Sequence, residues 1–267
     1  MPAPAELEIS RENLASRLDD LLELTGQVKH VEVLAATVDG IARHYRQLGV
    51  ACLLCEADTG AFFRYLCAGG LARAHVLERV RWDSVIDLQY LCATSSWPFY
   101  DAVAAGDLET AARIARASRK TWAEEDEDEA GFLRARFLMG LVAPKLEGVP
   151  PQDHLLEHLL RLADPEDDPW SATCDALHRR NAAGFEEAIA ALTRDLADEW
   201  AQERKNPNRD PDQMLTEAFV SVEATALVRL ARLAGVPTPE ELPLVPSLAL
   251  VDPPAPVRPP EAWMRGA

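Results

Sequence analysis

The sequence predicts an all-α protein in which antiparallel helix pairs stack into a single helical domain. Along most of the 267 residues, apolar side chains recur every three or four positions, as they do on one face of a helix. Ala, Leu, Glu and Arg dominate, whereas only 6% of the residues are aromatic and β-branched runs are scarce. The sequence contains neither hairpin signals nor an alternation of strands with helices. We therefore expect helices and no sheet.

The first 80 residues predict three helices. Ser10 is a suitable N-cap for the first, whose apolar face comprises Leu14, Leu18, Leu21 and Leu22. The second has the clearest apolar stripe of the chain, formed by Val31, Leu34, Val38, Ile41, Tyr45, Leu48, Cys52 and Cys55. A third helix is expected after residues 58–60, with Gly69 and Gly70 as the candidate bend.

Two later stretches each read as helix, turn, helix. "WPFYDAVAAGDLETAARIARAS" (residues 97–118) turns at Gly106 and Asp107, and "CDALHRRNAAGFEEAIAALTRDLADEW" (residues 174–200) turns at Gly184. They share a similar start, an Ala-rich link and a similar second helix. Two copies are fewer than the ~3 that a repeat array usually needs. They indicate stacked helix pairs that are only weakly repeat-like.

Further helices are expected at residues 132–142 and 155–162, followed by a last strong helix. That helix carries Leu215, Phe219, Val222, Ala226, Leu230 and Leu233, and should stop at Gly235. Nine of the 19 prolines follow Ala234. From residue 252 onward no periodicity remains, so we expect a helical domain over residues 1–251 and a Pro-rich extended or disordered tail over residues 252–267.

The formal charge of −17 argues against two classes of partner. An acidic surface repels nucleic-acid phosphates and anionic lipids, so neither nucleic acid nor a membrane is expected to bind. No apolar run approaches the ~20 residues of a membrane span. The five cysteines are odd in number and mostly lie in apolar patterns, as reduced thiols do. We therefore expect a cytoplasmic protein.

The acidity is concentrated in one part of the chain. Residues 121–170 hold 13 acids and four bases, a net charge of −9. One or two acids suffice at a helix start, where each contributes at most ~1 kcal/mol. The excess predicts a surface for a basic protein, although a solvated loop remains the alternative. The candidate partner-binding residues are Glu124, Glu125, Asp126, Glu127, Asp128, Glu129, Asp167 and Asp168.

The alternative function is a zinc-dependent hydrolase that uses the "HLLEH" motif. On a helix, His154 and His158 share one face and could hold zinc, with Glu157 beside them as a base. The third ligand would have to come from far away, and Glu217 and Glu223 are the candidates. A solvent-facing pair of histidines explains the motif more simply. We therefore expect no catalytic residues, no metal and no cofactor.

Two other features have structural explanations. "CLLC", Cys52 to Cys55, lies in the middle of a helix rather than at the strand-to-helix junction of a redox motif, so we expect core cysteines. Glu223 borders an apolar stripe, and we expect it to be half-buried and paired with an arginine of a neighbouring helix.

The order of several segments resembles the immunity protein 49 family. These segments are "IARHYRQLGVACLLCEADTGAFFRYL", "FYDAVAAGDLETAARIA", "EAGFLRARFLMGLV" and "FVSVEATALVRLARLAGV" followed by "LPLVPSLALV", within residues 9–251. The resemblance implies an all-helical, non-enzymatic antidote that binds a cognate bacterial toxin in the cytoplasm and blocks its active site or its access to substrate. A basic toxin, for example a nuclease, would suit the charge.

Overall fold

The computed structural model describes residues 4–26, 28, 30–82, 89–144, 146–254 and 262–264. These residues contain eleven α-helices, two short 3-10 helices and no strand, which confirms the predicted all-α class. In chain order the α-helices are α1 (Pro4–Thr25), α2 (Val31–Glu56), α3 (Thr59–Leu77), α4 (Pro98–Ala104), α5 (Leu108–Ala117), α6 (Glu129–Val142), α7 (Gln152–Leu162), α8 (Pro169–Arg179), α9 (Ala182–Glu203), α10 (Pro211–Leu215) and α11 (Val222–Leu233). The 3-10 helices are η1 (Ser247–Leu250) and η2 (Ala262–Met264).

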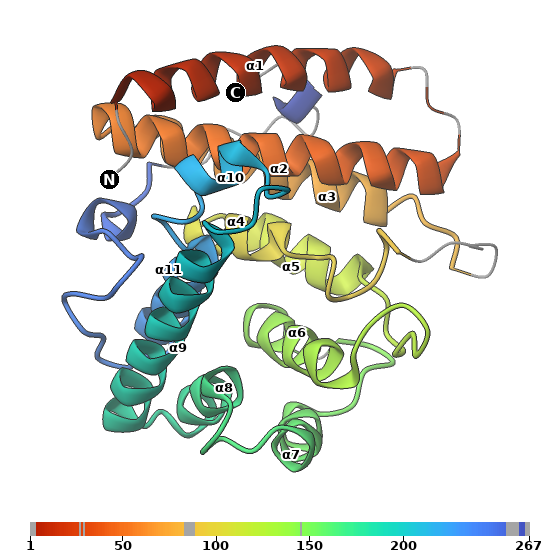
Figure 1. Ribbon diagram of the computed structural model, residues 1–267. Helices are drawn as coiled ribbons and strands as arrows, with labels where there is room; N and C mark the ends of the chain where they lie inside the picture. Colours follow the sequence, from red (N-terminus) through yellow and green to blue (C-terminus); the bar gives the residue numbers. More distant parts are fainter. Residues whose placement is uncertain are drawn as a thin grey trace.

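The first three helices run back and forth beside one another, and the later helices extend from this layer (Figure 1). The apolar stripe predicted for α2 faces the core, where Ile41 and Tyr45 are fully buried. The predicted start at Ser10 is wrong, because α1 begins at Pro4. Ser10 is instead buried inside the helix and donates a 2.6 Å hydrogen bond to Asp212 of the distant α10. A good capping residue is equally able to anchor a tertiary contact.

Gly69 and Gly70 do not interrupt α3, which is continuous across them. A Cβ atom on Gly70 would lie 3.0 Å from the Cβ of Ala102, and one on Gly69 would lie 3.3 Å from the carboxylate of Asp101. Both contacts are with α4. The two glycines therefore serve the close approach of two helices.

The two predicted helix pairs exist, but only one of the predicted turns is correct. Gly106 adopts a positive φ between α4 and α5, and Asp107 caps α5 as expected for a turn there. In the second pair, Gly184 lies inside α9. The turn falls earlier, at the left-handed Arg180 and at Asn181, whose side chain accepts a 3.2 Å hydrogen bond from the backbone N–H of Gly184. Asparagine at the N-cap fixes the helix start more strongly than the glycine that follows it.

The last predicted helix is divided in two. Leu215 ends α10, and α11 starts only at Val222, after Ser221 caps it through a 3.1 Å hydrogen bond from the backbone N–H of Ala224. Leu215 and Phe219, which continue the apolar spacing across the interruption, are only half-buried, and α10 buries Asp212 and Gln213 instead. The apolar periodicity therefore did not reveal the break between α10 and α11.

The C-terminal region contains a folded contact. Within the predicted tail, residues 255–261 and 265–267 lie outside the described residues. Trp263 of η2 is fully buried, its ring meets that of His75, and its backbone carbonyl accepts a hydrogen bond from the Tyr45 hydroxyl. This short part of the tail is thus neither extended nor solvated, while the domain boundary at residue 251 stays a prediction.

The cysteines behave as core residues. Cys52 is buried and Cys55 half-buried, and both are free thiols; they lie close to the C-terminal end of α2 and not in its middle as expected. Burial raises the pKa of each thiol, which disfavours the reactive thiolate. Within the part of the chain that the structure describes, no helix combines the length and apolarity that crossing a membrane requires.

Candidate functional site: a pocket between two acidic segments

A buried arginine organises the centre of the molecule. Arg46 of α2 is only 5% exposed, and its Nε atom donates a 2.7 Å hydrogen bond to Asp101 of α4. Its Nη1 atom binds the carboxylate of Glu223 on α11 and lies 3.9 Å from that of Glu217. We call these four residues the Arg46 cluster. The expectation that Glu223 is half-buried and paired with an arginine of a neighbouring helix is confirmed.

The Arg46 cluster holds three carboxylates against one guanidinium. Burial opposes the charge of Arg46, but Asp101, Glu223 and Glu217 outweigh it and raise the pKa of the guanidinium. Burial raises the pKa of Asp101 to about 7, and it also raises the pKa of Glu217. The cluster therefore has an excess of acceptors, and one of its carboxylates takes up a proton near neutral pH.

Trp97 covers the same arginine. The guanidinium carbon of Arg46 lies 4.5 Å from the centroid of the Trp97 ring, and Nη2 donates a 3.2 Å hydrogen bond to the Trp97 carbonyl. The indole N–H donates to Asp39 at 3.1 Å, which fixes the ring from its other end. A cation–π contact and a hydrogen bond thus hold this wall residue in place.

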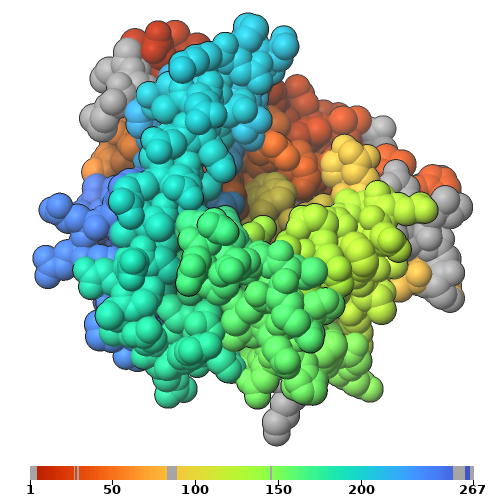
Figure 2. Space-filling view, turned by 60° about the horizontal axis from the view of Figure 1, so that its bottom comes forward, coloured from red at the N-terminus to blue at the C-terminus, as the bar shows by residue number. Residues whose placement is uncertain are grey.

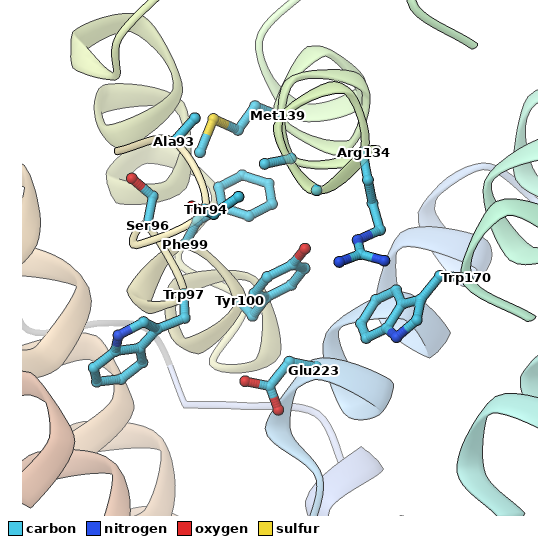
Figure 3. A pocket seen from close by; sticks show the side chains of 12 residues that line it. Ala93, Thr94, Ser96, Trp97, Phe99, Tyr100, Arg134, Met139, Trp170 and Glu223 are labelled. Carbon is cyan, nitrogen blue, oxygen red and sulfur yellow. The ribbon is translucent and has the colours of Figure 1, made fainter. Parts of the chain in front are cut away.

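A pocket of about 180 Å³ opens beside the cluster (Figure 3). We call it the aromatic pocket; its walls are Ala93, Thr94, Ser96, Trp97, Phe99, Tyr100, Gly131, Arg134, Ala135, Met139, Trp170 and Glu223. Figure 3 shows the guanidinium of Arg134 between the rings of Tyr100 and Trp170, with the carboxylate of Glu223 below them. The guanidinium carbon lies 4.6 Å from the centroid of Trp170. The pocket therefore combines aromatic faces with one cation and one carboxylate.

The pocket lies in a larger hollow of the surface. Figure 2 shows this hollow between the orange α2, the cyan segment around α10 and the yellow-green and green segments on the remaining sides. Its floor has the yellow colour of the segment that contains α4. Walls that are distant in sequence thus enclose one concave face.

Two members of the acidic run, residues 124–129, build the wall of the aromatic pocket. Glu127 is buried, and its carboxylate accepts hydrogen bonds from the backbone N–H and the hydroxyl of Thr94 at 3.0 and 3.1 Å. Asp128 caps α6 and accepts a 2.6 Å hydrogen bond from the backbone N–H of Gly131. Both Thr94 and Gly131 line the pocket. Part of the acidic run is therefore structural.

The second acidic segment, residues 164–168, reaches the same pocket. Asp168 caps α8 and accepts hydrogen bonds from the backbone N–H groups of Trp170 at 3.3 Å and Ser171 at 3.1 Å. Trp170 is a pocket wall. Two acidic segments that are 35 residues or more apart thus hold opposite parts of one site.

The remaining candidate partner-binding residues form no such hydrogen bonds with residues that line the pocket. Glu124, Glu125, Asp126 and Asp167 are exposed. Glu129 is half-buried in the first turn of α6, 3.5 Å from His158. Whether these carboxylates contact a partner stays a prediction.

The zinc hypothesis finds no support in this arrangement. His154 and His158 lie along a separate groove beside Trp122 and Phe132. Both carboxylates considered as the third ligand belong to the Arg46 cluster instead. Among the described residues, no group of three or more His, Cys, Asp or Glu side chains has the arrangement of a metal site.

Sequence reasoning found Glu223 but missed its partners. Arg46 directly follows Tyr45 within the strongest apolar stripe, and Asp101 interrupts the apolar "FYDAVA". A charged residue enclosed by buried positions signals a buried ion pair, so both could have been found. Tyr100, Arg134 and Trp170 carry no such signal, because only the fold brings their three helices together.

Comparison with known proteins identifies the family. No curated protein and no solved structure matches this chain. The family model described as Immunity protein 49 matches residues 42–249, which include the Arg46 cluster and every wall of the aromatic pocket. This match covers well over half of the 267 residues and agrees with the resemblance of the individual segments. The chain belongs to the immunity protein 49 family.

Proposed function

We propose that this immunity protein neutralises a cognate bacterial toxin by direct binding in the cytoplasm, without catalysing a reaction. The observation that carries the proposal is the convergence of both acidic segments on one concave site. Glu127, Asp128 and Asp168 hold the pocket wall, and their neighbours Glu124 and Asp167 remain exposed. Family membership supports a protein partner of the toxin class.

The partner's contact surface is basic. Exposed carboxylates that border a hollow attract a positively charged partner and raise its association rate. The aromatic pocket adds a concave surface on which a partner side chain can pack, while its Trp170 ring and its Glu223 carboxylate already contact Arg134 and Arg46. Immunity would follow if the toxin's catalytic surface faces this hollow and loses access to its substrate.

The experiment measures association with the toxin encoded beside this protein. Glu124, Glu125, Asp126 and Asp167 are changed together to Gln or Asn. We expect the association rate at low salt to fall by about tenfold and its salt dependence to flatten, because exposed charges act mainly through screened steering.

A matched control removes the same charge elsewhere. Glu186, Glu187, Glu240 and Glu241 are also exposed and do not line the aromatic pocket. Changing these four to Gln alters the net charge equally but should leave most of the rate intact. If both variants fold and lose the same rate, only the total charge matters and the proposed contact surface is wrong.

Protection in the cytoplasm has its own readout. Co-expression of the toxin without a secretion signal should arrest growth, and the parent protein should restore it. The variant at residues 124–126 and 167 should protect only at a higher expression level. A toxin that forms no complex with the purified parent protein would refute direct neutralisation.

A further inference from the structure

A second pocket has the opposite charge. It has a volume of about 290 Å³ and is lined by Arg116, Lys120, Arg136, Pro144, Leu146 and Glu147. Three of these residues are cations and one is an anion, in a chain whose net charge is −17. We call it the Arg136 pocket. Such a local reversal of charge calls for a physical explanation.

Arg136 of α6 is fully buried with half of its guanidinium unused. Its Nη1 atom donates to the carbonyl of Ala115 at 3.0 Å and lies 3.3 Å from the sulfur of Met139. Its Nε and Nη2 atoms are buried and have no hydrogen-bond partner among the described residues. Leaving buried donors unpaired is costly, especially on a charged group.

The unused edge is the one that binds oxyanions. In Arg113 the same two atoms, Nε and Nη2, hold both oxygens of Glu78 at 2.8 and 2.9 Å. This fork geometry matches carboxylate and phosphate groups. Burial lowers the pKa of Arg136 to about 10, with the charge of Glu127 acting in the opposite direction, so the group stays protonated at neutral pH. No carboxylate of the described residues occupies this edge.

Two further cations stand at the pocket. Arg116 lies in the last turn of α5 and Lys120 in the loop that follows; both are exposed. Neither forms an ion pair within the described part of the chain, and the exposed Glu147 pairs with neither. Long unpaired side chains around a buried guanidinium can close on an anion that enters between them.

We propose that the Arg136 pocket binds a phosphate group. The fork of Arg136 takes two oxygens once the groups that cover its Nε and Nη2 atoms move aside, and Arg116 and Lys120 take the remaining charge. A dianion suits the three cations better than a singly charged carboxylate does. This inference goes beyond toxin neutralisation and does not depend on it. The phosphate group can arrive as a free ion or as part of a nucleotide, and the experiment separates these sources.

The test is isothermal titration calorimetry of the full-length protein in chloride buffer at constant ionic strength. The titrants are inorganic phosphate, adenosine monophosphate and, as a carboxylate control, acetate. We expect saturable binding of inorganic phosphate and much weaker binding of acetate. Tighter binding of the nucleotide would assign the phosphate group to a nucleotide, and equal or weaker binding would assign it to the free ion.

Two variants locate the site. Arg136→Met should abolish phosphate binding, and the double variant Arg116→Gln, Lys120→Gln should weaken it roughly tenfold. The double variant changes only exposed side chains, so it stays informative even if Arg136→Met does not fold. The matched control, Arg64→Gln with Arg194→Gln, removes two exposed cations on other helices and should bind like the parent.

The proposal fails in either of two ways. In the first, the parent protein shows no saturable phosphate binding at constant ionic strength, and the pocket holds only solvent. In the second, the double variant and its control bind phosphate equally well, and the anion binds elsewhere. Failure here leaves the toxin-binding proposal untouched, because the toxin experiment involves none of these cations.

Discussion

Arg46 and Arg136 are both buried in the same helical protein, but their surroundings differ in kind. Arg46 meets three carboxylates, and Asp101 and Glu223 raise its pKa against the effect of burial. Arg136 meets a backbone carbonyl and a sulfur, and burial lowers its pKa to about 10. Arg46 is thus the single cation among three carboxylates of its cluster. Arg136 is a positive charge with which no carboxylate of the described residues forms an ion pair.

The difference shows why net charge describes this protein poorly. A chain with a charge of −17 contains both a carboxylate-rich site and a cationic pocket. The first site suits a basic protein surface and the second a small anion. Replacing each arginine in turn tests whether the two environments differ in their effect on stability.

The largest effect is expected for Arg46→Met. The substitution leaves Asp101, Glu217 and Glu223 without their common partner, and breaking a buried ion pair in this way costs about 3–5 kcal/mol of unfolding free energy. Urea denaturation at pH 8 measures it. The loss should be smaller at pH 5, because burial raises the pKa of Asp101 and Glu217 and a protonated carboxyl group needs no counter-ion.

Arg136→Met is the matched comparison. It removes two unpartnered donors along with the bond to Ala115, so in phosphate-free buffer its unfolding free energy should stay within about 1 kcal/mol of the parent value. Equal losses for the two variants would show that burial, and not the number of carboxylates, governs both sites.

An intermediate effect is expected from pH. The pKa of Asp101 is raised from 3.8 to about 7 in the folded protein. Between about pH 4 and 7 the folded state keeps a proton that the unfolded state releases, so this group's contribution to stability is complete below pH 4 and is lost as the pH rises through 7. The stability of the parent relative to Asp101→Asn should therefore fall across this window. A difference that is constant from pH 4 to 8 would contradict the raised pKa.

The smallest effects concern the acidic run, where structural and exposed carboxylates are neighbours. Glu127→Gln and Asp128→Ala should each lower the unfolding free energy by about 1 kcal/mol, because they weaken the contacts with Thr94 and Gly131. Glu124→Gln and Asp126→Asn should change it by less than about 0.5 kcal/mol. Thermal unfolding ranks the four variants. Equal effects would mean that the run acts as one solvated loop.

The fold class and most helices could be predicted from the sequence. A three-to-four residue spacing of apolar side chains reports a local geometry, so α2, α4 and α5 could be predicted. It also indicated the half-buried Glu223 and the localised acidity. Where one residue type serves two purposes, local patterns missed the tertiary role: Ser10 anchors α10 instead of capping a helix, and Gly69 and Gly70 admit a neighbouring helix.

Which charged side chains contact one another depends on how the helices pack. Arg46 and Glu223 are separated by 177 positions, and no local pattern encodes their contact. The same holds for Glu127 and Asp168, which in the sequence are ordinary members of two acidic segments. In the folded protein, where α4, α6 and α8 pack together, they form hydrogen bonds with residues that line one pocket. The physical reason is that helix formation depends on neighbours along the chain, whereas burial and pairing of a charge depend on which helices pack around it.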